Sequence, residues 1–255
     1  QRNRQDLINP LHGLDGQIAL DGSFNRGNDI VRVLGKADSY VIGRTSASSA
    51  YIEAGTTTKV TIPIGSTGLG IVYDDGVRKL SFSGGAYKIG SQTFSADPTK
   101  ITSATDGTVL PTGANPATQA VVSLLAAGLS GGTAPDLTIT GKVRIVGTNG
   151  VDVIKLGSTG GDLTFDGSFN RGGDIIILNK AAGDYSAAKF SGSTIVISSG
   201  IEKLTIPMGS TGLTLRFTDG DRTLIFKNSA FNIGDQIISS ATATPLTPSS
   251  ITLSA

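Results

Sequence analysis

Four aspartates each stand two positions after a glycine, and this spacing could build calcium sites. Calcium takes about six to eight oxygen ligands, and a Gly-x-Asp turn offers both carboxylate and backbone carbonyl oxygens. The alternative is that each aspartate only closes its own turn by accepting backbone hydrogen bonds. From the sequence, both interpretations stay open. The candidate metal ligands are Asp29, Asp152, Asp162 and Asp174.

Side chains that could perform catalysis are scarce. The chain has no cysteine, and its single histidine, His12, has no partner at a fixed spacing. No nucleophile elbow, phosphate-binding loop or zinc-protease motif occurs. Two close carboxylate pairs, Asp74 with Asp75 and Asp219 with Asp221, could serve glycoside hydrolysis, but each falls in an expected hairpin turn. We therefore predict that the protein is not an enzyme.

The composition excludes several other classes of protein. Of 255 residues, 35 are glycine and 38% are hydrophobic, and the formal net charge is +1. This hydrophobic content with so little net charge does not fit a disordered chain. The 21 basic residues are scattered among 20 acidic ones, so we expect no nucleic-acid partner, which would need a concentrated basic face. No apolar run is long enough to predict a membrane-spanning helix.

An internal duplication organises the chain. The block DGSFNRG at residues 21–27 recurs unchanged at residues 166–172, and TIPIGSTGL at 61–69 recurs as TIPMGSTGL at 205–213. The offset is 145 residues at the first block and 144 at the second, so one deletion separates two copies. Many glycines therefore occupy matching positions and mark turns in a repeated architecture.

The elements that must position the aspartates are short strands. Runs rich in β-branched and aromatic residues alternate with Asp-Gly and Gly-Gly turns, which predicts a sandwich or a roll. The fold class is therefore all-β, with two homologous tandem β modules joined by a short helical linker. The expected organisation is an extended N-terminal segment at 1–13, a first β module at 14–97, a linker at 98–142 with a helix near 116–128, a second β module with a roll-like start at 143–241, and a C-terminal tail at 242–255.

The helix in the linker rests on a capping pattern and on apolar spacing. Asn115 followed by Pro116 fits the start of a helix. The apolar residues Ala120, Val121 and Leu124 then follow the helical spacing of three and four. We interpret this segment as a connector packed on one module, and the alternative is an element that docks on a neighbouring subunit.

Residues 143–178 bring three of the candidate aspartates into a regular pattern of strands and glycine-rich turns, among them GSTGG at 157–161. This pattern, with a remnant at 14–33, resembles the calcium-binding nonapeptide repeats of RTX proteins. The resemblance implies a parallel β-roll in which aspartates of successive turns hold calcium between them.

The repeated unit as a whole is similar to modules in large secreted surface proteins of Gram-negative bacteria. The likeness lies in the Gly-x-Asp-Ile turn, in Tyr185 and in the block at 205–213. It implies an extracellular, cell-surface structural protein that self-assembles, as an S-layer or filament subunit or as an adhesin, with calcium as a stabiliser. Its partners would be other copies of itself and a surface polysaccharide.

Two further expectations complete this interpretation. The alternative function is a carbohydrate-binding module of a larger secreted protein, with Tyr51, Tyr73 and Tyr87 as aromatic platforms for sugars. The strands at 143–158 have no recognisable counterpart before the first module. We therefore expect another copy, or the rest of a longer array, to supply the missing strands.

Overall fold

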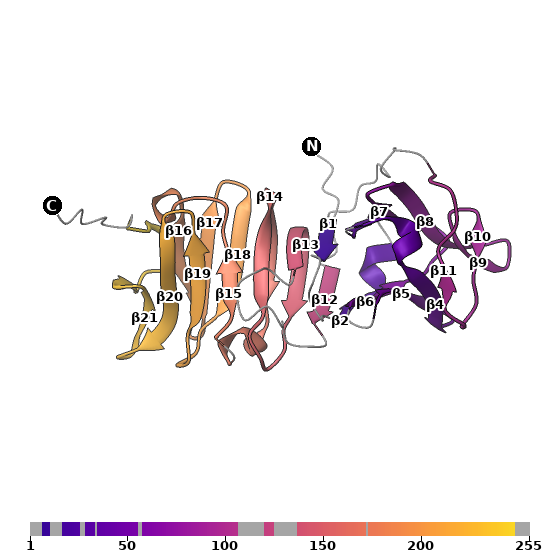
Figure 1. Cartoon of the computed structure of the whole chain (residues 1–255). Helices are drawn as coiled ribbons and strands as arrows, with labels where there is room; N and C mark the ends of the chain where they lie inside the picture. Colours follow the sequence, from indigo (N-terminus) through magenta and orange to yellow (C-terminus); the bar gives the residue numbers. More distant parts are fainter. Residues whose placement is uncertain are drawn as a thin grey trace.

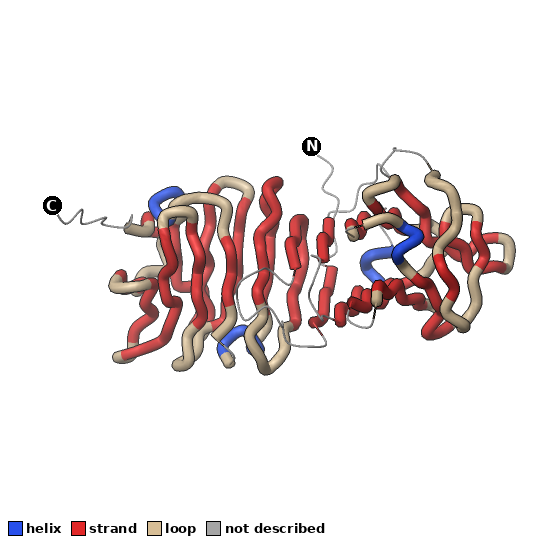
Figure 2. Tube along the Cα trace, in the orientation of Figure 1, coloured by secondary structure: helices blue, strands red, loops and turns tan. Residues whose placement is uncertain are grey.

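The computed structural model describes residues 7–10, 17–25, 29–33, 35–55, 58–106, 120–124, 137–171 and 173–247. The predicted all-β fold is confirmed, because these residues form strands joined by turns and by short 3-10 helices (Figure 2). Within this part of the chain, no helix is long and apolar enough to cross a membrane.

The described part of the chain divides into a first half (residues 7–106), a second half (residues 147–247) and two strands between them. The first half contains β1 (Leu7–Pro10), β2 (Gln17–Leu20), β3 (Ile30–Arg32), β4 (Val41–Ser46), β5 (Ser49–Ala54), β6 (Thr58–Pro63), β7 (Leu69–Tyr73), β8 (Gly76–Ser83), β9 (Ala86–Ile89), β10 (Gln92–Thr93) and β11 (Thr99–Lys100), with the 3-10 helices η1 (Gly22–Asn25) and η2 (Ala37–Ser39). Between the halves lie β12 (Ala120–Leu124) and β13 (Leu137–Val146). The second half contains β14 (Val153–Phe165), β15 (Ile175–Ile177), β16 (Ser186–Ser191), β17 (Thr194–Ser199), β18 (Glu202–Pro207), β19 (Leu213–Phe217), β20 (Gly220–Lys227), β21 (Ala230–Ile233), β22 (Gln236–Ile238) and β23 (Thr244–Pro245), with η3 (Gly167–Asn170) and η4 (Ala182–Asp184).

Backbone pairing arranges the strands in two rows that run along the molecule (Figure 1). One row has the order β10-β9-β8-β7-β3-β1-β13-β14-β15-β19-β20-β21-β22. The other has the order β11-β4-β5-β6-β2-β12-β13-β14-β18-β17-β16-β23. Buried and half-buried residues alternate along strands such as β17 and β19, so each row turns one face inward onto a core that both halves share.

Strands β13 and β14 belong to both rows because each bends at glycine. The first part of β14 pairs with β15, and its last part pairs with β18. Gly141 and Gly160 have φ values of 91° and 74°, which glycine adopts without steric cost. A Cβ on Gly161 would lie 2.8 Å from the Gly141 carbonyl oxygen. The GSTGG segment, expected as a turn between two strands, is therefore a bend inside one continuous strand.

The repeated sequence blocks occupy equivalent places in the two halves. The block DGSFNRG contains η1 in the first half and η3 in the second, and it buries Phe24 and Phe169 completely. β2 pairs in parallel with β6 as β14 pairs with β18, and β3 pairs with β7 as β15 pairs with β19. The same turn chemistry thus produces the same strand pairing twice.

The helix predicted near residues 116–128 is wrong for residues 120–124, which form strand β12, and the rest of that segment lies outside the described residues. β12 pairs in parallel with β13 and antiparallel with β2. Val122 and Leu124 are buried and alternate with half-buried Val121 and Ser123. Backbone pairing on both sides of this short apolar run outweighs its local helical spacing.

The strands that we expected another copy to supply are present in this chain. β1 pairs in parallel with β3, as the first part of β14 pairs with β15. β12 lies beside β2, where the last part of β13 lies beside β14 in the second half. Because β1 also pairs with β13, the chain itself closes the junction between its halves.

Candidate functional site

Two of the four candidate ligands, Asp152 and Asp174, meet at the edge where the chain turns into β14 and β15. Each residue directly precedes one of these parallel strands, so the two are neighbours across the pair. The Asp152 N–H donates to Asp174 Oδ1 at 2.7 Å, and both residues are fully buried. Asp174 therefore ties its own turn to the preceding one.

The carboxylate of Asp152 closes the turn between β13 and β14. Thr148 donates to both of its oxygens, through its backbone N–H to Oδ2 at 2.6 Å and through Oγ1 to Oδ1 at 3.0 Å. Burial raises the pKa of Asp152, the two Thr148 hydrogen bonds lower it and the charge of Asp166 raises it, and the net direction is upward. This is the turn role that the sequence left as the alternative to metal binding.

Asp166, the first residue of the second DGSFNRG block, joins the same edge. Its side chain accepts hydrogen bonds from the N–H of Ser168, which caps η3, and from the N–H of Gly147 at 3.2 Å. A Cβ on Gly147 would lie 2.6 Å from Asp152 Oδ2 and 2.6 Å from Ser168 Oγ. The edge therefore packs so closely that a side chain at residue 147 would displace Asp152 and Ser168.

The other two candidate ligands lie elsewhere. Asp162 is on the last part of β14, where its Oδ1 is 3.9 Å from Lys203 Nζ. Asp29 is the first-half equivalent of Asp174, since the Asp29 carbonyl accepts from Gly70 N–H at 3.1 Å and the Asp174 carbonyl from Thr214 N–H at 2.8 Å. Among the described residues, no group of three or more acidic, histidine or cysteine side chains is placed to hold a metal ion. Calcium binding by these aspartates stays a prediction.

Comparison with protein-family models and with curated proteins finds no match for this chain. The likeness to RTX repeats and to bacterial surface modules stays an expectation from motifs. The roles assigned to individual residues rest on their geometry.

Three of the four carboxylates that could have served glycoside hydrolysis lie in hairpin turns, Asp74 and Asp75 between β7 and β8 and Asp219 between β19 and β20, whereas Asp221 is the second residue of β20. Their contacts are Asp75–Arg78 at 2.8 Å, Asp219–Arg222 at 3.1 Å, Asp221–Arg216 at 3.1 Å, and Gly35 N–H to Asp74 Oδ2 at 3.0 Å. Burial raises the pKa of Asp75, but the hydrogen bonds from Ala37 N–H and Arg78 together lower it by more, so the net direction is downward. These carboxylates hold turns together. His12 lies outside the described residues.

The tyrosines expected as sugar platforms are occupied by the protein itself. Tyr73 is buried, and its ring packs edge-on against that of Tyr40 at 5.4 Å. Lys59 Nζ lies 4.1 Å from the centre of the Tyr51 ring. Arg44 covers the Tyr87 ring at 4.8 Å and donates to its hydroxyl at 3.3 Å. Burial excludes Tyr73 as a platform, and cationic side chains lie over the other two rings.

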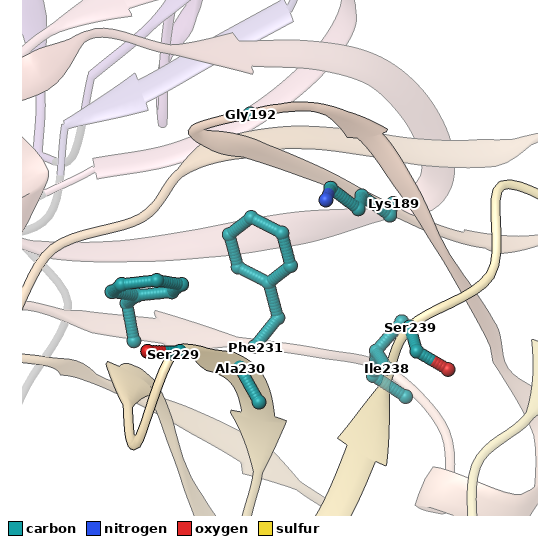
Figure 3. A pocket seen from close by; sticks show the side chains of 8 residues that line it. Lys189, Gly192, Ser229, Ala230, Phe231, Ile238 and Ser239 are labelled. Carbon is teal, nitrogen blue, oxygen red and sulfur yellow. The ribbon is translucent and has the colours of Figure 1, made fainter.

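A pocket of about 220 Å³ that the sequence did not indicate lies in the second half. It is bounded by the β16–β17 hairpin, the β20–β21 hairpin and β22, and Figure 3 shows the Lys189 amine above the Phe231 ring. Lys189 Nζ is 5.2 Å from the centre of that ring, and the Phe226 ring is 5.3 Å from the Phe231 ring. Ile238, Gly192 and the serines at 229 and 239 complete the lining with Ala230.

The sequence predicts the inward face of a strand that borders this pocket, but not the pocket itself. Alternation along β20 predicts that Leu224 and Phe226 face inward, and Leu224 is indeed buried. Phe226, at the end of the same face, is 41% exposed because the layer stops there and leaves the pocket beside it. Alternation identifies the face of a strand but not where the opposing layer ends.

Proposed function

We propose that the protein is an extracellular structural component, built of two homologous tandem β modules, that self-assembles at a cell surface as an S-layer or filament subunit or acts there as an adhesin. The observation that supports this is the continuity of both strand rows across the junction. The rows pass through β1, β12 and β13, so rotating one half against the other would break backbone hydrogen bonds. A stiff elongated unit suits a repeating assembly.

The ends of the rows indicate how copies would meet. The terminal strands β10, β11, β22 and β23 are two or three residues long, and short edge strands discourage the addition of a strand from another chain. Contacts between copies would then use side chains. Three large apolar residues of the second half are well exposed, Phe190 at 71%, Ile201 at 59% and Ile237 at 61%. These exposed apolar side chains are candidates for the contacts between copies.

Light scattering during size-exclusion chromatography, with electron microscopy of the same sample, tests this proposal. We expect a mass above the 25.9 kDa of one chain that grows with concentration, and ordered arrays or filaments in the images. Phe190→Ser should lower the assembled fraction because it removes exposed apolar surface. Thr45→Ser, at the equivalent exposed position of the first half, is the control. A monodisperse monomer at high concentration would overturn self-assembly.

Thermal melting decides whether calcium stabilises the protein. Calcium held by Asp152 and Asp174 predicts a higher Tm in millimolar calcium chloride than in EDTA, whereas carboxylates that only accept hydrogen bonds from Thr148 and from the backbone predict the same Tm in both. An ion that binds only the folded state must raise Tm. A calcium-dependent rise that Asp152→Asn abolishes would establish calcium ligation at this edge.

The second candidate function is carbohydrate binding. The pocket of the second half favours it, because an aromatic ring and a cation stand together at a partly open site. The surface polysaccharide expected from the sequence would then bind through Phe226 and Lys189 rather than through the tyrosines.

A further inference from the structure

The space that forms the pocket in the second half is filled by side chains in the first half. The pair Phe82–Tyr87 in β8 and β9 corresponds to Phe226–Phe231 in β20 and β21. The Tyr87 hydroxyl reaches across and donates to the Ala47 carbonyl at 3.0 Å, and Arg44 lies over the Tyr87 ring.

In the second half the corresponding side chains are smaller or shorter. Phe231 lacks the hydroxyl that Tyr87 uses, Gly192 stands in place of Ala47, and Ile238 stands in place of Phe94. Lys189 takes the position of Arg44, since the Arg44 N–H donates to Ser95 and the Lys189 N–H to Ser240 in the same manner. The duplicated scaffold is thus kept while its end is hollowed.

The lining selects a ligand by charge and by shape. No acidic residue lines the pocket, and Lys189 forms no ion pair within the part of the chain that the structure describes, so a ligand anion would meet an ammonium group. The exposed part of Phe226 offers an apolar surface, and Ser229 and Ser239 offer hydroxyls. Pockets for drug-sized ligands measure about 300–1,000 Å³, so this smaller pocket suits a single ring.

We infer that the pocket binds one uronic acid residue of an acidic polysaccharide. The carboxylate of the sugar pairs with Lys189 Nζ, the C–H face of its ring packs on the exposed Phe226, and its hydroxyls reach Ser229 and Ser239. Each of these groups lies in the lining of the one pocket. This inference rests on the second candidate function, carbohydrate binding, and does not depend on self-assembly.

Calorimetric titration of the full chain with trigalacturonate tests the inference, and the fully methyl-esterified trisaccharide is the neutral control. We expect saturable binding of the acid and about fivefold weaker binding of the ester, the size of one partly exposed ion pair. Lys189→Gln should weaken binding of the acid about fivefold and leave binding of the ester unchanged. Phe226→Ala should weaken both at least about tenfold, because it removes the stacking surface.

A double variant transfers the filling of the first half into the pocket. Gly192→Ala with Phe231→Tyr should weaken binding of trigalacturonate at least about tenfold while Tm stays unchanged, because the first half already accommodates these side chains. The matched control is Phe82→Ala, at the first-half equivalent of Phe226, which should leave binding intact.

The possible results distinguish a wrong pocket assignment from a wrong assignment of carbohydrate binding. If trigalacturonate, its ester and an array of other glycans all fail to bind, both the pocket assignment and carbohydrate binding are overturned. If the acid binds and the pocket variants leave its affinity unchanged, carbohydrate binding stands and the pocket assignment is wrong.

Discussion

The two halves of the chain share their turns and differ in what lies between the turns. In both halves an Asp-Gly-x-Arg hairpin carries an aspartate, Asp75 or Asp219, that accepts a backbone N–H from a 3-10 helix and pairs with the arginine three residues on. In both, that arginine lies near an aromatic ring, at 5.6 Å in the first half and 5.2 Å in the second. The repeated Asp-Gly-x-Arg motif therefore holds a hairpin turn to a 3-10 helix in each half, and we call this arrangement a joint.

Behind these joints, the interiors of the two halves have diverged. In the second half, buried Glu202 accepts from the Tyr185 hydroxyl and lies 3.4 Å from Lys180 Nζ. In the first half the positions of Lys180 and Glu202 are Gly35 and Thr58, although the edge-on ring pair Tyr40–Tyr73 matches Tyr185–Phe217. The fold therefore accommodates different side chains at these positions while the turn hydrogen bonds are unchanged, and the pocket is a second such case.

The largest loss of stability is expected where the two halves bury the equivalent phenylalanine. Phe24→Ala and Phe169→Ala each remove a fully buried ring from the same motif, so each should lower the free energy of unfolding by about 3–5 kcal/mol. Because the strand rows cross the junction, both variants should shift one common transition in urea, followed by circular dichroism. Phe190→Ala, at an exposed ring, is the control. Two separate transitions, each sensitive to one variant, would show that the halves unfold independently.

A smaller effect tests whether the DGSFNRG turns of the two halves are equivalent. Asp21→Ala and Asp166→Ala each delete an oxygen that accepts from the N–H of a serine and from a neighbouring segment, at Val121 or at Gly147. Loss of such a cap costs about 1–2 kcal/mol, so the two variants should be destabilised equally in urea titrations. Unequal losses would mean that β12 holds the first half differently from the way β13 holds the second.

The dependence of stability on pH should separate the halves in sign. The pKa of Asp152 is raised in the folded state, so its contribution is present in full below the unfolded pKa of about 3.9 and is lost as pH rises through the folded value. The pKa of Asp75 is lowered, so its contribution is present above about 3.9 and is lost as pH falls through the folded value.

Urea unfolding of the wild type, Asp152→Asn and Asp75→Asn from pH 3 to pH 7 measures this difference. Relative to the wild type, Asp152→Asn should gain stability as pH rises, and Asp75→Asn should lose it. Parallel pH profiles for the two variants would contradict the assigned environments.

The strands and the hairpin turns were predictable because their determinants are local. Asp75–Gly76 and Asp219–Gly220 predicted two hairpin turns, and both occur between the expected strands. Asp152 was named as either a metal ligand or a turn acceptor, and its hydrogen bonds with Thr148 are those of a turn. Local residue types suffice where a turn satisfies its own backbone.

What could not be predicted depends on partners distant in sequence. β12 has helical spacing but lies between β2, about a hundred residues earlier, and β13, and only that pairing makes it a strand. The bend of β14 at Gly160 lies against β18, and the next residue, Gly161, packs closely on the bend of β13 at Gly141. The pocket arises from volume lost at Gly192 and Phe231, which the fold brings together, so no local pattern records it.

The smallest change in the free energy of unfolding is expected at the β20–β21 turn. Asn228 and Ser229 have φ values of 53° and 61°, whereas Gly84 and Gly85 take the same left-handed turn in the first half with 61° and 75°. A left-handed conformation costs a residue with a side chain about 1 kcal/mol, and glycine avoids that cost but is more flexible when unfolded. Ser229→Gly should therefore raise the free energy of unfolding by about 0.5 kcal/mol, and Gly85→Ala should lower it by about 1 kcal/mol, both measured in urea. A loss of stability in Ser229→Gly would mean that contacts of the serine side chain outweigh the strain of its backbone.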